Sequence, residues 1–141
     1  MKRLLYLTIC ALLALGLSSC SKVNPKDYPK FILGTWDLES IVYYMDDKVV
    51  QTDSGYDSQH TSRTTLSFHD DGIVKYDLRF SGGSSMSLFY KYSVSGEYLL
   101  MQGVGYQISF EGNRMYLALD MISATGSVKY NKMVDVFKRV K

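Results

Sequence analysis

Few side chains in this 141-residue chain are of the types that carry out acid–base, nucleophilic or metal chemistry. The two histidines, His60 and His69, have no partner at metal-ligand spacing. The paired acids Asp46-Asp47 and Asp70-Asp71 stand between apolar runs, which is typical of solvated hairpin residues. Nothing suggests that a nucleophile, a base and an orienting group converge. The sequence therefore predicts neither an enzyme nor a metal site, and no cofactor.

The chemistry open to the two cysteines depends on where they stand. Met1-Lys2-Arg3 supplies two cations, and residues 4–17 form a predominantly apolar run that includes Cys10. As a helix this run would rise about 21 Å, short of the roughly 30 Å hydrocarbon core of a membrane. A cationic start, a short apolar run and small residues at its end are typical of a secretory signal peptide. Residues 1–19 are predicted to be this peptide.

Leu17-Ser18-Ser19-Cys20, directly after the apolar run, resembles the lipobox of bacterial lipoproteins. The resemblance implies cleavage before Cys20, a diacylglyceryl thioether on its sulfur and an acylated amine, with palmitate as the expected acyl chain. Two or more acyl chains hold a protein on a membrane, whereas one holds it only marginally. The alternative is ordinary signal cleavage, which would leave Cys20 as an unpaired thiol in an oxidising compartment.

The remainder of the chain has a balanced charge. Removing residues 1–19 takes Lys2 and Arg3 from the 16 basic residues and leaves 14, equal to the 14 acidic ones. A neutral chain has no electrostatic footprint for nucleic acid and no polybasic patch for a membrane surface. In the lipoproteins that this chain resembles, Ser21 after the cysteine favours the outer membrane. A lipid-anchored protein of the cell outer membrane is therefore expected, and whether it faces the periplasm or the cell surface stays open.

The chain divides into a tether and one domain. Residues 20–30 combine the cysteine with a polar segment that contains both prolines, Pro25 and Pro29, and are interpreted as an extended tether. In residues 31–141 apolar and polar side chains alternate with a period of two, and Gly, Asn and Asp turns separate the runs. The predicted strands lie at 34–45, 63–69, 73–80, 86–94, 97–102, 105–110, 113–120 and 129–139, with a short extra strand around 48–52 and one helical turn near 28–33.

Many short antiparallel strands indicate either a sandwich or a barrel. Gly34-Thr35-Trp36 resembles the Gly-x-Trp motif of lipocalins, and the order of hairpins up to the final "FKRV" is similar to small lipocalin-like lipoproteins of Gram-negative bacteria. The resemblance implies an all-β, eight-stranded antiparallel up-and-down barrel with little helix. It also implies that a basic residue of the last strand packs across Trp36 and closes the barrel. Arg139 is the best match to that residue, and Lys138 is its rival.

Tyrosine is frequent, with 12 in the chain, and several tyrosines fall on faces that simple alternation turns inward. Around a cavity they would form an apolar wall with polar tips, suited to an amphipathic or aromatic ligand, with the 53–62 loop at its mouth. They would equally well fill a small barrel. The candidate ligand-binding residues are Tyr44, Tyr76, Phe80, Tyr90, Tyr92 and Tyr106.

Two functions are compatible with these features. The first is a lipid-anchored, lipocalin-like barrel that binds a small apolar or amphipathic ligand at the cell envelope. The second is a structural or protein-interaction module of the outer membrane, with a packed barrel and with outward Ile41, Tyr43 and Phe89 available to an envelope protein partner. A connected cavity above roughly 300 Å³ favours the first function, and a filled interior favours the second.

Overall fold

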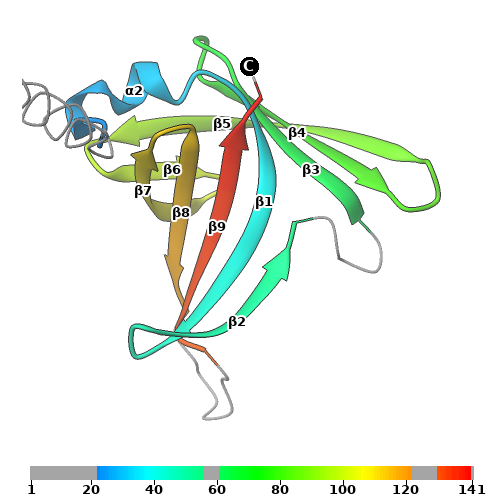
Figure 1. Cartoon of the computed structure of the whole chain (residues 1–141). Coiled ribbons are helices and arrows are strands. Elements are labelled where there is room, and N and C mark those ends of the chain that lie inside the picture. Colours follow the sequence, from blue (N-terminus) through cyan, green and yellow to red (C-terminus); the bar gives the residue numbers. More distant parts are fainter. Residues whose placement is uncertain (1–21, 56–60, 122–129, 141) are drawn as a thin grey trace, which may run out of the picture.

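The computed structural model describes residues 22–55, 61–121 and 130–140 (Figure 1). The predicted signal peptide, Cys20 and His60 lie outside these residues. The elements are η1 (Pro25–Asp27), α2 (Tyr28–Phe31), β1 (Gly34–Met45), β2 (Lys48–Ser54), β3 (Thr61–Phe68), β4 (Ile73–Phe80), β5 (Ser85–Ser95), β6 (Tyr98–Met101), β7 (Val104–Glu111), β8 (Arg114–Asp120) and β9 (Lys132–Arg139).

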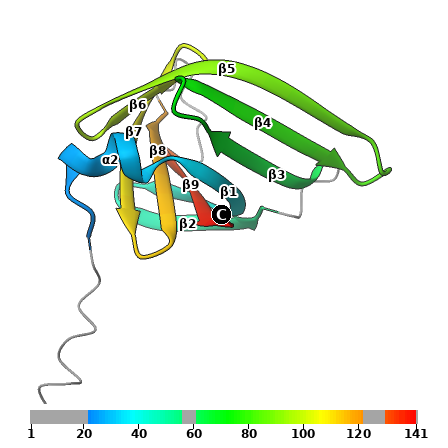
Figure 2. The ribbon, with the colours of Figure 1, turned by 90° about the horizontal axis from the view of Figure 1, so that it is seen from above.

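Eight of these strands close into a barrel. Antiparallel pairing runs from β1 to β3 and through each successive strand to β9, and β9 pairs back with β1. The closing seam extends along β1 from Trp36 to Tyr44. Figure 2 shows the barrel with β3, β4 and β5 along one side and β1, β8 and β9 along the other. The predicted eight-stranded antiparallel barrel with little helix is confirmed.

Strand β2 lies outside the ring, as a hairpin on the second half of β1. Asp46 and Asp47 form its turn, with φ angles of 48° and 64° in the left-handed region that aspartate tolerates. Both are exposed, as expected for hairpin aspartates. β3 pairs with β1 only from Gly34 to Asp37, so β2 and β3 occupy successive stretches of the same edge of β1 and then diverge (Figure 1).

A β-bulge interrupts β1 just after its start. Leu38 lies opposite Phe137 of β9, and Ser40 lies opposite the next residue, Val136, so Glu39 is the extra residue. Because side chains alternate along a strand, one inserted residue moves every later side chain to the other face. The second half of β1 therefore presents the opposite set of side chains to the interior.

The faces predicted for three residues beyond this bulge are wrong. Ile41 and Tyr43, predicted to point outward, lie opposite the inward residues of β9, and Ile41 lines a cavity inside the barrel. Tyr44, predicted to point inward, lies on the outer face with its cross-strand partner Lys132, whose Nζ is 4.8 Å from the centre of the tyrosine ring. Alternation counted from Trp36 assigns these three side chains to the wrong face because it does not allow for the extra residue at Glu39.

η1 and α2 cover one end of the barrel (Figure 1), and Tyr28 and Ile32 belong to the hydrophobic core. Pro25 is the first residue of η1 and Pro29 is the second residue of α2, where the fixed φ of proline suits a helix start. Tyr28 is buried, and its ring lies 4.9 Å from that of Phe110 in an edge-to-face contact. The described part of the predicted tether, residues 22–30, is therefore folded onto the barrel and is not extended.

Within the described residues, no helix is long and apolar enough to cross a membrane. The largest fully buried side chains are Trp36, Phe110, Ile32, Leu66, Leu99, Ile108, Met115, Leu117 and Val74.

Candidate functional site

Trp36 and Arg139, the two residues predicted to close the barrel, lie together at its covered end. They are direct cross-strand partners, and the guanidinium carbon of Arg139 lies 4.1 Å from the centre of the Trp36 ring and 4.8 Å from that of Phe31. Arg139 donates hydrogen bonds to the carbonyl of Leu33, at 2.8 Å, and to that of Phe31. Trp36 Nε1 donates to the carbonyl of Ile32 at 2.8 Å.

These bonds tie the first strand, the last strand and α2 into one unit. Burial lowers the pKa of Arg139 from its usual value, because desolvation disfavours the charged form. Lys138, the rival for this role, is exposed. The donors of Arg139 are directed at backbone carbonyls, so the pair has a structural role.

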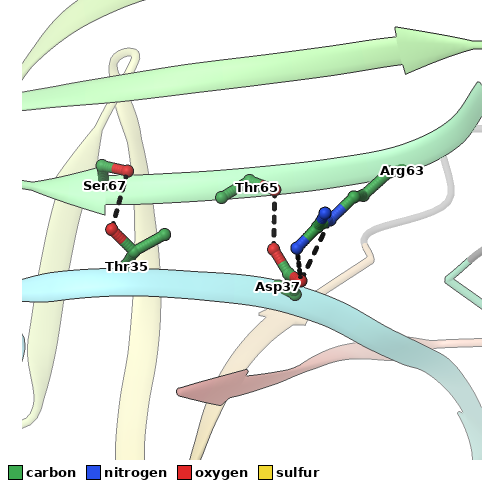
Figure 3. Close-up of polar contacts among 5 residues, drawn as sticks. All are labelled: Thr35, Asp37, Arg63, Thr65 and Ser67. Carbon is green, nitrogen blue, oxygen red and sulfur yellow. Dashed lines mark hydrogen bonds and ion pairs between the residues drawn. The ribbon is translucent and has the colours of Figure 1, made fainter. Parts of the chain in front are cut away.

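Polar side chains also join β1 to β3 on the outer face of the barrel (Figure 3). The buried carboxylate of Asp37 accepts hydrogen bonds from Nε of Arg63 at 3.0 Å, from Nη2 of the same residue and from the Thr65 hydroxyl at 2.7 Å. The hydroxyls of Thr35 and Ser67 lie 3.2 Å apart at the next outward pair. These contacts align the two strands where their pairing is short.

A matching contact spans the other side of β1. Glu39, the bulge residue, accepts hydrogen bonds from Nε and Nη2 of Arg114 on β8, at 2.7 and 3.0 Å. These bonds hold the pKa of the Glu39 carboxyl below its usual range. The carboxylates of Asp37 and Glu39 are thus each paired with an arginine.

A cavity of about 310 Å³ lies inside the barrel. It is just above the roughly 300 Å³ at which small-molecule sites begin, so the interior is not completely filled. Ser54 and Gly55, at the end of β2, and Thr64 of β3 form part of its wall where the two strands diverge. The apolar lining consists of Leu38, Ile41, Leu66, Leu78, Met101, Leu117, Met133 and Phe137.

Asp135 of β9 places a carboxylate in this cavity. It lies in register with Ile41 of β1 and Leu117 of β8, which also line the cavity. Its Oδ1 is buried and has no hydrogen-bond partner, and the ion pairs between described residues do not include it. Burial raises the pKa of the Asp135 carboxyl to about 6, because desolvation disfavours its charged form.

Two of the predicted ligand-binding residues, Tyr76 of β4 and Tyr106 of β7, share the cavity with Asp135. Burial raises the pKa of both phenols, and the negative charge of Asp135 raises it further. The three groups therefore border a common space that is otherwise mostly apolar. Such a site suits a ligand with an apolar body and one hydrogen-bonding or charged end.

The other four predicted ligand-binding residues do not line the cavity. The Tyr92 hydroxyl donates a hydrogen bond to the carbonyl of His69, at 2.6 Å, in the turn after β3. Tyr90 packs against the core, Phe80 lies at the end of β4 beside a hairpin, and Tyr44 is on the outer face. His69 thus lies at the turn between β3 and β4, where its carbonyl also accepts from the Gly72 amide.

Asp135 is the site residue that sequence reasoning missed, although a signal for it exists. The sequence predicts a last strand at 129–139 with Arg139 turned toward Trp36. Positions 137 and 135 share that face, so the assignment of Arg139 already places Asp135 inside. The signal is weak because Val134 and Val136 make the opposite face of the strand equally apolar.

A larger hollow, of about 610 Å³, lies along β7, β8 and β9 beside the first described residues, from Lys22 to Pro25. Outward side chains such as Gln107 and Ser109 line it, and both are exposed. Lys22 forms an isolated bridge with Glu111 at its edge. Among the hollows in the described residues, the barrel interior combines a largely apolar wall with a carboxylate oxygen that lacks a hydrogen-bond partner, and it is the candidate site.

The architecture is consistent with a lipocalin-like fold, since eight antiparallel strands close in up-and-down order. Comparison of the chain with protein-family models and with curated proteins gives no match. The function has to be inferred from the residues that surround the cavity.

Proposed function

We propose that this protein is a lipid-anchored, lipocalin-like barrel of the cell envelope that binds a small amphipathic ligand in its interior. The observation that carries this proposal is the cavity of about 310 Å³, in which apolar walls meet Tyr76, Tyr106 and Asp135. A barrel that served only as a scaffold would be more stable with that space filled and without a buried acid.

In this proposal the ligand enters the cavity between β2 and β3, where Ser54, Gly55 and Thr64 line it. Ser54 and Gly55 lie at the end of β2, and Thr64 lies near the start of β3. No backbone ladder joins β2 to β3 among the described residues. Residues 56–60 of the predicted mouth, 53–62, lie outside the described residues.

The anchor is proposed from the lipobox-like Leu17-Ser18-Ser19-Cys20, with the outer membrane as the destination. Lys22 already contacts the barrel at Glu111. Two residues of chain span at most about 7 Å, so acyl chains on Cys20 would hold this part of the barrel close to the lipid surface. The function that we propose is ligand binding without a chemical reaction.

Native mass spectrometry tests ligand binding. The sample is the chain from residue 20 with Cys20→Ser, purified without detergent from the host of origin; the described core residues lie between Tyr28 and Phe137 and are all retained. We expect a small molecule to co-purify with the wild-type protein. It should be absent from Met133→Trp, whose larger side chain fills the cavity, and present in Val134→Trp, which changes the opposite face of β9. Repeated absence, with no thermal shift across fatty acids, sterols and aromatic compounds, would exclude the proposal.

One observation favours the second function, an interaction module of the outer membrane. Phe89, Tyr98 and Leu100 are 64%, 64% and 52% exposed on β5 and β6. Of Ile41, Tyr43 and Phe89, which were predicted to point outward, Phe89 alone is more than half exposed. Cross-linking in whole cells tests this function: a partner lost on Phe89→Ser and Leu100→Ser, with an unchanged cavity, would support it.

A further inference from the structure

Asp135 is costly to keep inside the barrel. The residue is half-buried, but its Oδ1 is fully buried, and a buried carboxylate oxygen without a partner is unfavourable. Its nearest cross-strand partners, Ile41 and Leu117, are apolar, and its Oδ1 has no hydrogen bond. Each buried unsatisfied group in a folded protein needs an explanation, and a bound ligand is one that the cavity allows.

Among the described residues, the titratable groups that face Asp135 are phenols. Tyr43 of β1, Tyr76 of β4 and Tyr106 of β7 are the side chains whose pKa the Asp135 charge raises. The residue paired with it on β8 is Leu117. The described wall of the cavity thus consists of apolar side chains, phenols and the uncharged polar residues Ser54, Thr64 and Gln102, and it contributes no charge of opposite sign.

The cations of β9 itself are engaged elsewhere. Arg139 lies on the same face but donates to carbonyls of the α2 segment. Lys132 reaches Asp47 on the outside, at 3.2 Å, and Lys138 is exposed. The positive charge that would balance Asp135 is therefore absent from the described residues around the cavity.

We propose that the ligand is a small primary amine with an apolar body, bound as its ammonium ion to the Asp135 carboxylate; this inference rests on the proposed function of the cavity. An ammonium group supplies donors for charge-assisted hydrogen bonds to the carboxylate. The rings of Tyr76 and Tyr106 add aromatic surface, which attracts cations. A carboxylate or phosphate ligand is disfavoured by repulsion, and a purely apolar ligand leaves Asp135 without a partner.

Three probes with the same apolar body test this inference: 2-phenylethylamine, 2-phenylethanol and 3-phenylpropionate. Binding to the chain from residue 20 with Cys20→Ser is measured by calorimetry and by shifts of amide resonances. At pH 7.5 we expect the amine to bind at least about tenfold more tightly than the alcohol, and the acid to bind weakest. Asp135→Asn should remove this preference, whereas Asp77→Asn, on the outer face of β4, should preserve it.

The pH dependence separates binding to Asp135 from binding elsewhere. Asp135 takes up a proton below about pH 6, so amine affinity should fall about tenfold at pH 5, while the alcohol affinity stays constant. Equal binding of the amine and the alcohol to wild type and to Asp135→Asn would overturn the inference and leave the binding cavity intact. If none of the three probes shifts the cavity resonances, the proposed function falls as well.

Discussion

The guanidinium of Arg139 lies over the indole of Trp36, 4.1 Å from the ring centre, and the two residues are opposite each other on the last and first strands. One side chain therefore connects both ends of the sheet, and it also holds the carbonyls of Leu33 and Phe31. This contact reinforces the seam at which β1 and β9 close the barrel.

Replacement of Arg139 should destabilise the barrel. Arg139→Ala removes the cation–π contact and leaves two carbonyls without their donors, at a cost of about 3 kcal/mol in the free energy of unfolding. Arg139→Lys keeps the charge but loses the planar fork, and about half of that loss is expected. Urea unfolding followed by tryptophan fluorescence measures both values.

Lys138 provides the matched control, because it is adjacent, basic and exposed. Lys138→Ala should change the free energy of unfolding by less than about 0.5 kcal/mol. Equal losses for Lys138→Ala and Arg139→Ala would show that the stacked guanidinium does not close the barrel.

Gly55 should tolerate no side chain. A Cβ atom there would overlap the carbonyl oxygen of Leu38 and lie 2.7 Å from its carbonyl carbon. The end of β2 would have to move, which weakens the hydrogen bond from the Gly55 amide to the Glu39 carbonyl, now 2.9 Å long. We expect Gly55→Ala to lower the free energy of unfolding by about 1–3 kcal/mol, as measured by urea unfolding.

A glycine in open space tests whether this loss comes from the overlap. Gly82 has no atom within 4 Å of its would-be Cβ, and its φ is not in the left-handed region. Gly82→Ala should be neutral within about 0.5 kcal/mol. A neutral Gly55→Ala would mean that β2 does not pack on Leu38 in solution.

Strand positions could be predicted from the sequence because they depend on local features. The strand at 73–80 alternates cleanly and is bounded by Asp70-Asp71-Gly72 and Ser81-Gly82, so pattern and turn chemistry agree on both of its ends. The helical turn at 28–33 is local in the same sense. Barrel closure was not local, and it was predicted from the resemblance carried by Trp36.

The inward set of side chains could be predicted only in part. Nothing in the residues around Glu39 marks a bulge, because the extra residue is defined by its register with β9, about a hundred positions away. Tyr76 lies on a strand without interruption and is placed correctly at the cavity. Tyr44 lies beyond the bulge and is not. The candidate site also includes Asp135. The sequence does not show which way Asp135 points, because both faces of its strand carry apolar residues.

Cys20 carries a prediction that a membrane fractionation can check. If its sulfur is lipidated, the protein from its host should sediment with membranes and gain the mass of a diacylglycerol and an acyl chain on its first peptide. Cys20→Ala should abolish both the added mass and the cleavage, because the thioether forms on the sulfur. Ser19→Ala keeps a small residue before the cysteine and should leave both unchanged. An unmodified thiol in the wild-type protein would contradict the anchor.

The half-buried Asp135 carboxyl should make the barrel less stable as the pH rises. The pKa of Asp135 is raised from 3.8 to about 6, so between these values the unfolded chain has lost a proton that the folded chain keeps. The free energy of unfolding therefore falls with increasing pH through this window, by about 3 kcal/mol in all. Asp135→Asn lacks this term, so its stability relative to wild type should increase between pH 4 and pH 7.

Urea unfolding at pH 4, 5, 6 and 7.5 measures that difference, with Asp70→Asn in an exposed turn as the control. The control changes an exposed side chain, so its difference from wild type should be small. If the Asp135→Asn difference does not change across the series, the carboxylate is solvated or paired in solution. The cavity would then hold no unbalanced charge. A loss of stability at neutral pH could no longer be used to argue that Asp135 is kept for a ligand.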